Sequence, residues 1–436
     1  VFANPKKELQ FFNLRKGVDV ILSKNTVNGL FEITYRFEFG AKHSRTIGLA
    51  AEYAQYLSSS KYSLVDFNSK LYELGAGYGL STSDDNVYLT IYGLNEEVQP
   101  TLALVEEHLR SLVPDAEKYN EFIQAVLKGR ADKLLDPKGV FGALYAYVQY
   151  GPKNPTNSVL SNEELKAQKP EDLVKEIASL FDMPHTVVAF TPSAKGDLTK
   201  VLNATHPAPA TLAELPKQLH DFKARIPQGE SQVYVVNFPE ANQIFLSHYG
   251  NSDERYDVNK AAVRRLYNEY FGGSMNAIVF QEIREARALA YSAFSVYRTP
   301  SRKEDPYYLY SYIGTQADKL PDAIAAFNEI LLNMPESDKA FEVAKNGILE
   351  QLRTKRFDGR SMPNLYFYLK NLGVEKSIDE VVYNAVPKLV VEFQKSSVKP
   401  LVYDYAVLGD PQKTDRPTLE KLGKVKEVKI EELFGF

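Results

Sequence analysis

Hydrophobic and polar positions alternate strictly in several short stretches, and the longest of them lies near the start of the chain. Between residues 31 and 39 every second side chain is apolar, namely Phe31, Ile33, Tyr35, Phe37 and Phe39. Because successive side chains of a strand point to opposite faces, this stretch predicts a strand with one buried face. Similar stretches at 18–22 and 87–93 predict further strands.

A strand-to-helix pattern occurs twice along the chain at the same spacing. A strand-like stretch that ends at Gly93 is followed by Pro100 and an amphipathic helical pattern, and a second one that ends at Gly314 is followed by Pro321 and another such pattern. The two glycines are 221 residues apart, and so are the two prolines. Proline is common in the first turn of a helix, so this shared spacing indicates a duplicated unit.

A proline-rich segment near the middle of the chain separates the two units. It contains Pro207, Pro209, Pro216 and Pro227. Proline at this density interrupts helices and sheets alike, which is typical of a linker. We therefore predict a first domain over residues 1–205, a linker over 206–228 and a second domain over 229–436. Each domain closes with a strand-like stretch, at 185–190 and at 401–408.

Within each unit the strands follow one another with few helices between them. Parallel strands need long crossover connections, which are mostly helical, so a mostly antiparallel sheet is expected. The remaining helices are expected to pack on one face of that sheet. The predicted fold class is therefore α+β, with two homologous domains.

Composition narrows the class of protein without identifying its function. The 436 residues, of which 44% are hydrophobic and 25% are charged, are typical of a globular protein of two or three domains. No apolar stretch approaches the ~20 residues of a membrane span. A net charge of −4 without basic blocks argues against nucleic acid as the main partner. The absence of cysteine excludes disulfides, thiolate metal sites and a cysteine nucleophile.

Familiar catalytic motifs are missing from the sequence. It contains no Gly-rich phosphate loop, no nucleophile elbow and no H-E-x-x-H. No two of the six histidines lie three to five residues apart, so none forms a zinc pair on a helix or hairpin. His108, beside Glu106 and Glu107, is predicted to be a solvated surface residue, and His43 a loop residue without a partner.

The stretch from Phe37 to Gln55 combines a predicted strand, a loop and a helix that opens with Gly-Leu-Ala. It resembles the pitrilysin/insulinase-type zinc peptidases, in which this helix carries the inverzincin motif H-x-x-E-H. The resemblance implies the mitochondrial processing peptidase-like metallohydrolase fold. It places the first His of the motif at Ala51, the Glu at Ala54 and the second His at Gln55.

All functional positions of that zinc motif are changed in this sequence. The family's third ligand, a Glu on a later helix, corresponds to Gly129. Alanine has no donor atom, and a glutamine amide oxygen is a poor zinc ligand beside an imidazole. Glu52 and Asp132 are nearby carboxylates, but without an imidazole they would not hold zinc tightly. We therefore predict that this chain binds no metal and no cofactor.

A second stretch, residues 270–292, resembles the C-terminal signature of the same family. It contains the Gly272-Gly273 loop, a helix, and the pair Arg284 and Tyr291. The resemblance implies that this pair belongs to a non-catalytic domain, faces a zinc site across a closed chamber, positions the substrate and stabilises the developing oxyanion. A guanidinium and a phenol can both donate to a carbonyl oxygen that gains charge. The alternative is an ordinary solvated or helix-C-terminal Arg284 and a Tyr291 that is a strand residue of the core.

The resemblance implies an inactive peptidase-like half that pairs with a catalytic half, fused upstream or on a separate chain, to form a peptide-degrading chamber. Zinc is then expected in the partner half, and a peptide is expected as the substrate. Two alternatives remain: a stand-alone structural or peptide-binding protein, and a weak hydrolase with an unconventional metal site, against which the missing His pair counts. A periplasmic or secreted location is also implied. The start at Val1, without an initiator Met, is expected of a processed protein or a piece of a longer one.

Overall fold

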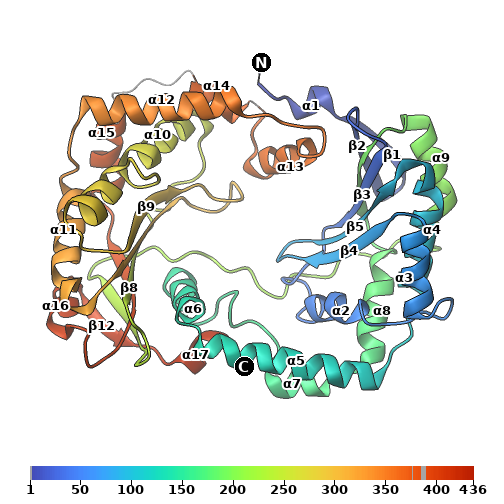
Figure 1. Ribbon diagram of the computed structural model, residues 1–436, viewed down its shortest axis with the longest axis horizontal. Coiled ribbons are helices and arrows are strands. Elements are labelled where there is room, and N and C mark those ends of the chain that lie inside the picture. The colour runs from blue at the N-terminus through green and yellow to red at the C-terminus, as the bar shows by residue number, and fades with distance from the viewer. Residues whose placement is uncertain (1, 376, 384–388) are drawn as a thin grey trace.

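The computed structural model describes residues 2–375, 377–383 and 389–436. Within them the chain forms two halves, each built on a six-stranded sheet, and the halves face each other across the middle of the molecule (Figure 1). None of the described helices is both long enough and apolar enough to cross a membrane.

The first half contains six strands and all of the helices up to α9. Its strands are β1 (Gln10–Arg15), β2 (Val18–Lys24), β3 (Leu30–Phe37), β4 (Gly77–Thr82), β5 (Val87–Leu94) and β6 (His185–Thr191). Its helices are α1 (Pro5–Glu8), α2 (Ile47–Ala54), α3 (Leu64–Glu73), η1 (Asn95–Glu97), α4 (Val98–Arg110), α5 (Ala116–Leu135), α6 (Pro137–Tyr150), α7 (Asn162–Ala167), α8 (Pro170–Leu180) and α9 (Lys195–Thr205). The alternation in β3 is confirmed, because Phe31, Ile33, Tyr35 and Phe37 are all buried.

The second half repeats this composition. Its strands are β7 (Gln232–Asn237), β8 (Ile244–Gly250), β9 (Ser292–Arg298), β10 (Tyr308–Thr315), β11 (Tyr403–Gly409) and β12 (Lys424–Glu427). Its helices are η2 (Val258–Lys260), α10 (Ala261–Phe271), η3 (Phe280–Ala286), η4 (Ala317–Lys319), α11 (Leu320–Leu332), α12 (Asp338–Thr354), α13 (Met362–Leu372), α14 (Ile378–Tyr383), α15 (Leu389–Phe393), η5 (Gln394–Val398), α16 (Arg416–Leu422) and α17 (Ile430–Phe434).

The two sheets have equivalent strand orders, which confirms the predicted α+β duplication. The orders are β1-β2-β6-β3-β5-β4 and β12-β7-β11-β8-β10-β9. The antiparallel pairs β3–β6 and β3–β5 correspond to β8–β11 and β8–β10. The repeated glycine and proline lie in equivalent elements, since β5, η1 and α4 in the first half match β10, η4 and α11 in the second. The sheets are mixed, however, because β2–β6, β7–β11 and β7–β12 are parallel pairs.

Two helices cross between the halves and pack on the face of the opposite sheet. Helix α6 of the first half lies on β7, β8 and β11, where Phe141 and Leu144 join a core cluster with Val236 and Phe245. Helix α13 of the second half lies against β2, where Met362 contacts the cluster of Leu9 and Ile21. The prediction of helices on one face only was therefore incomplete. The second face of each sheet is partly covered by a helix from the other half, which periodicity within one unit does not reveal.

The residues between α9 and β7 contain no helix or strand, as their prolines predicted. This connecting segment, residues 206–231, is nevertheless bound along its length to the first half. The backbone amides of Ala213, Leu219 and Arg225 donate to the carbonyls of Asp182, Lys42 and Gln149, at 2.8, 2.7 and 2.7 Å.

Candidate functional site

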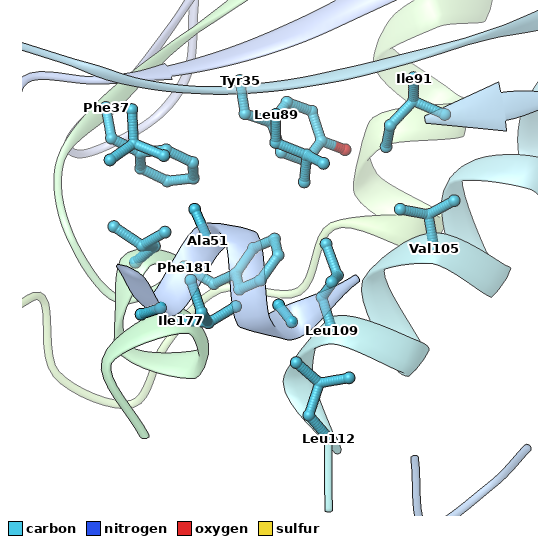
Figure 2. Packing of buried hydrophobic residues seen from close by; sticks show 14 of the residues in the cluster. Tyr35, Phe37, Ala51, Leu89, Ile91, Val105, Leu109, Leu112, Ile177 and Phe181 are labelled. Atoms are coloured by element: carbon cyan, nitrogen blue, oxygen red, sulfur yellow. The ribbon is translucent and has the colours of Figure 1, made fainter. Parts of the chain in front are cut away.

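Helix α2, where the sequence predicted an altered zinc motif, turns its inner face into the hydrophobic core of the first half. Ala51 and Ala54 are 3% and 1% exposed. Figure 2 shows Ala51 packed among the side chains of the core cluster, with Phe37, Ile177 and Phe181 close by. Both positions therefore accommodate small apolar side chains in the core.

The other two positions of the altered motif are exposed and provide no ligand. The Gln55 amide Nε2 donates back to the Ala51 carbonyl of its own helix at 3.5 Å. A Cβ at Gly129, on α5, would meet no atom within 4 Å. Nothing in this arrangement orients Gln55 towards a cation, and Gly129 leaves no carboxylate on α5 at the position of the third ligand.

The zinc ion that the resemblance associates with this helix does not fit the residues present. Two core alanines, a glutamine and a glycine provide none of the imidazole or carboxylate ligands that zinc requires. Across the described part of the chain, no group of three or more His, Asp or Glu side chains is arranged to hold a metal ion.

The histidines differ from their predicted environments. His108 is fully buried, and its ring stacks on Phe67 at 3.7 Å between ring centroids, so the prediction of a solvated surface residue was wrong. Burial lowers the pKa of His108 to about 4. The prediction that His43 has no partner was also wrong, because its Nδ1 accepts a hydrogen bond from the Gly40 amide at 3.1 Å and its ring stacks on Phe39. Partial burial and the neighbouring Lys42 lower the pKa of His43.

The segment that carries Arg284 and Tyr291 has an unusual backbone. Arg284 belongs to the π-helical segment η3, and Tyr291 directly precedes β9. Between them Ala288 has a φ of 49°, in the left-handed region that is strained for a residue with a Cβ. The Ala288 carbonyl accepts a hydrogen bond from Lys319 Nζ at 2.9 Å, which stabilises the turn. Short π-helical segments and strained residues are concentrated at functional sites.

Both side chains of this pair are accessible. The Arg284 side chain is 46% exposed and Tyr291 is 57% exposed. The Tyr291 hydroxyl accepts a hydrogen bond from Gln316 Nε2 at 2.6 Å, and the Arg284 guanidinium lies 4.8 Å from the Phe280 ring centroid. The alternative of a Tyr291 buried in the core is therefore wrong. In the described structure no hydrogen bond joins Arg284 to Tyr291 or joins either of them to α2.

A polar cavity of about 780 Å³ lies between the first sheet and residues of the second half. Its wall includes Glu32, Thr34 and Arg36 of β3, Leu215 and Gln218 of the connecting segment, and Arg302, Arg360 and Phe367 of the second half. Sequence reasoning did not identify this cavity, because its residues come from segments that are far apart in the chain.

Charges of both signs meet at this cavity, and several are paired between the halves. Arg360 is hydrogen-bonded to Glu32, and the Arg36 guanidinium lies 4.1 Å from the Phe367 ring centroid. Asp85 pairs with Lys42 of its own half and lies 3.9 Å from Arg302 of the other. The cavity wall is therefore polar and nearly balanced in charge.

Comparisons with known proteins agree with these features. Residues 169–348 match the family model described as the peptidase M16 inactive domain. The predicted relationship to a peptidase family through a non-catalytic domain is thereby confirmed. The matched residues run from the start of α8 through the connecting segment to α12, and they include the segment with Arg284 and Tyr291. No curated protein matches the sequence.

Solved structures share the fold of nearly the whole chain. A peptidase M16 inactive domain from Pseudomonas fluorescens is similar with a TM-score of 0.70 and 17% identity, over 93% of this chain and 99% of that one. The periplasmic protease PqqL from Escherichia coli gives a TM-score of 0.74 and 13% identity, over 94% of this chain and 46% of that one. The ferredoxin protease FusC, solved as a mutant in complex with Arabidopsis ferredoxin, gives 0.73 and 11%, over 92% and 45%. These identities are low enough that the likeness shows the fold alone.

Two residues that support the segment with Arg284 and Tyr291 were not identified from the sequence. Gln316 holds the Tyr291 hydroxyl, and Lys319 holds the turn at Ala288. The duplicated spacing could have pointed to Gln316, because Gln316 lies 221 residues after Asn95. Asn95 is itself a bonding residue, since its side-chain oxygen accepts hydrogen bonds from Thr191 and Ser193. The polar residue after the repeated strand thus has a bonding role in both halves.

Proposed function

We propose that this chain is the non-catalytic half of an M16 peptidase and pairs with a catalytic half to enclose a peptide. Arg284 and Tyr291 would then act on a substrate held at the partner's zinc site. The observation that carries this proposal is an accessible Arg/Tyr pair on a strained and braced turn, in a chain whose own zinc helix lacks every ligand.

The relatives support such an arrangement. This chain spans about half the length of PqqL and of FusC, both of which are proteases. A half of this size is therefore compatible with a two-half enzyme in which the catalytic half is fused to it or is a separate chain. PqqL is described as periplasmic, which supports a periplasmic location for this chain. The complex of FusC with ferredoxin supports a peptide or protein substrate.

The proposed chemistry assigns separate tasks to the two halves. Zinc in the partner would supply the activated water that attacks the peptide bond. Arg284 would hold the substrate carbonyl with a fixed positive charge, and the Tyr291 hydroxyl would donate to the oxygen as negative charge develops on it. The Gln316 amide donates to the Tyr291 oxygen, so the Tyr291 proton remains free to point at a substrate.

The test measures turnover by the enzyme assembled from this chain and its catalytic half. Losing one oxyanion donor typically lowers kcat by ~10²–10³. We expect Tyr291→Phe and Arg284→Ala each to lower kcat by about that factor, with zinc content and thermal stability unchanged, because both side chains are accessible rather than part of the core.

Matched controls separate this role from a general effect of substitution. Arg287→Ala removes a neighbouring exposed arginine that is paired with Glu282 and Glu329, and Tyr72→Phe removes the hydroxyl of an exposed tyrosine on α3. Both controls should retain full turnover. Normal turnover by Tyr291→Phe and Arg284→Ala in a verified active assembly would contradict the proposal.

The polar cavity favours a second candidate, a stand-alone peptide-binding protein. The cavity has a volume of about 780 Å³, and its wall presents carboxylates, guanidiniums and hydroxyls, which suit a peptide backbone and mixed side chains. This candidate predicts that the chain without a partner binds labelled peptides, and that Arg302→Ala weakens that binding.

A further inference from the structure

Four polar side chains meet in the core of the first half at the residue where the connecting segment begins. His206 follows α9, and its Nδ1 lies 2.6 Å from Glu106 Oε1 while its Nε2 lies 2.8 Å from His185 Nε2. Tyr35 of β3 donates to the same Glu106 oxygen at 2.7 Å. We call Tyr35, Glu106, His185 and His206 the buried histidine cluster. Each of its members is at most 5% exposed.

The contacts of the cluster determine how many protons it holds. His185 Nδ1 lies 2.7 Å from the Met183 carbonyl, which can only accept, so this nitrogen carries a proton. The contact between the two imidazoles needs one proton, and the contact between His206 and Glu106 needs another. The two histidines and the carboxylate therefore share three protons, whereas two neutral imidazoles and an ionised carboxylate hold two.

The surrounding groups place the additional proton on the side of His206 and Glu106. Burial, with smaller effects of His206, Arg15 and Arg110, lowers the pKa of His185 to about 4, so His185 is neutral. Arg110 of α4 donates to the second oxygen of Glu106 at 3.3 Å, so this oxygen, like the one bound to Tyr35, acts as an acceptor. Burial and the Glu106 carboxylate raise the pKa of Tyr35, so the phenol keeps its proton.

The cluster is connected directly to the segment between the halves. The Arg15 side chain of β1 donates to the carbonyl of Pro207, the next residue, at 3.2 Å. Further along, the Ala213 amide donates to Asp182, and Leu215 and Gln218 reach the wall of the polar cavity. The attachment of His206 therefore holds the first part of a segment that lines the cavity.

We propose that the buried histidine cluster retains one proton beyond those of two neutral imidazoles and a carboxylate, and that this proton fastens the start of the connecting segment to the first half. Without it, a bare ring nitrogen and a carboxylate oxygen would face each other at 2.6 Å inside the core. Tyr35 and Arg110 would still bind the carboxylate, but a contact between two acceptors with no hydrogen between them is unfavourable in the core, so His206 leaves the cluster and the segment loosens. The cluster is a pH-sensitive anchor for one wall of the cavity.

The sign of the pH dependence follows from the proton count. Above about pH 6.5, the ordinary pKa of histidine, the unfolded chain no longer holds the additional proton while the folded chain does. The contribution of this one proton to stability is therefore fully present below that pH and is lost as the pH rises. The equilibrium constant for unfolding should increase about tenfold per pH unit until the folded protein releases the proton.

The experiment measures unfolding by denaturant from pH 6.5 to pH 9, with amide exchange of residues 207–219 followed in parallel. Glu106→Gln replaces the carboxylate by an amide whose own hydrogen can donate to His206 Nδ1, so the additional proton is no longer required. In the wild-type chain we expect the free energy of unfolding to fall as the pH rises, with the slope that corresponds to one bound proton. Amide exchange of residues 207–219 should be faster at high pH. In Glu106→Gln the slope should vanish. The matched control is His220→Gln, which removes a histidine of the same segment outside the cluster and should keep the wild-type slope.

A spectroscopic measurement on the wild-type chain shows whether the cluster holds the additional proton, even if Glu106→Gln fails to fold. Imidazole ¹⁵N shifts at pH 8 should show one doubly protonated ring, assigned to His206 by its loss in His206→Gln, and a neutral His185. Two neutral imidazoles in the folded protein at pH 8 would overturn the proposal, and so would an unchanged slope in a folded Glu106→Gln variant.

Discussion

At the scale of single residues, burial is the main cause that lowers the pKa of three histidines. His108 stacks on Phe67, His185 lies against Phe37, and His248 is held by Ser311 and Asn328 in the core of the second half. Burial lowers the pKa of each ring to about 4. These histidines are therefore neutral in the folded protein at moderately acidic pH, where the unfolded chain would already be protonated.

The first prediction concerns acid stability. As the pH falls from 6.5 towards 4, the unfolded state binds protons at these three residues before the folded state does. Their contribution to stability is therefore fully present above pH 6.5 and is lost over that interval. Each ring contributes about 1.4 kcal/mol per pH unit. His108→Phe keeps the stacking on Phe67 but removes the titrating group. When urea unfolding is measured between pH 4.5 and 6.5, the free energy of unfolding of this variant should change with pH by one proton less than that of the wild-type chain. An identical slope in His108→Phe and in the wild-type chain would contradict this.

At the scale of elements, α2 is a core helix at the place where the resemblance implied an altered zinc motif. Its inner face packs on the sheet and on α8, and Ala51 and Ala54 are buried in the core on that face. The amphipathic pattern that forms the helix is independent of the zinc ligands. Helix α2 therefore forms without any zinc ligand at positions 51, 54 and 55.

The second prediction tests this packing by restoring one polar residue of the motif. Ala54→Glu would place an unpaired carboxylate at a position that is 1% exposed, which should lower the free energy of unfolding by roughly 3–5 kcal/mol. The matched control Gln55→Glu introduces the same side chain at the next, exposed position and should change stability by no more than about 0.5 kcal/mol. Denaturant unfolding of the two variants compares them directly. Equal stability of the two would show that α2 is not packed as described.

At the scale of the whole molecule, the halves are joined by exchanged helices as well as by the connecting segment. Helix α6 covers a face of the second sheet, and α13 covers part of the first. Pairs such as Glu32 with Arg360 add polar contacts across the cavity. The second sheet is consequently buried on both faces along β8 and β11.

The third prediction follows from this exchange. Leu144 of α6 is fully buried against the second sheet, and Leu144→Ala should destabilise the protein by about 2–5 kcal/mol. Amide exchange should accelerate in β7 and β11, although the substitution lies in the first half. Leu135→Ala, at an exposed leucine that ends α5, is the control and should leave both properties unchanged. Faster exchange confined to the first half would contradict the packing of α6.

The sequence by itself determined the features that depend on local periodicity and on motif chemistry. Alternation predicted the strands, the spacing of 221 residues predicted the duplicated α+β unit, and the residues at Ala51, Ala54 and Gln55 predicted that this helix lacks the inverzincin ligands. Only the tertiary structure decided which distant groups meet. It buried His108 that the sequence placed in solvent, exposed Tyr291, exchanged α6 and α13 between the halves, and brought His206 to Glu106 across 100 residues of chain. The physical reason is that hydrophobic periodicity reports which face of an element is buried, whereas the partner on that face is set by the packing of the whole chain.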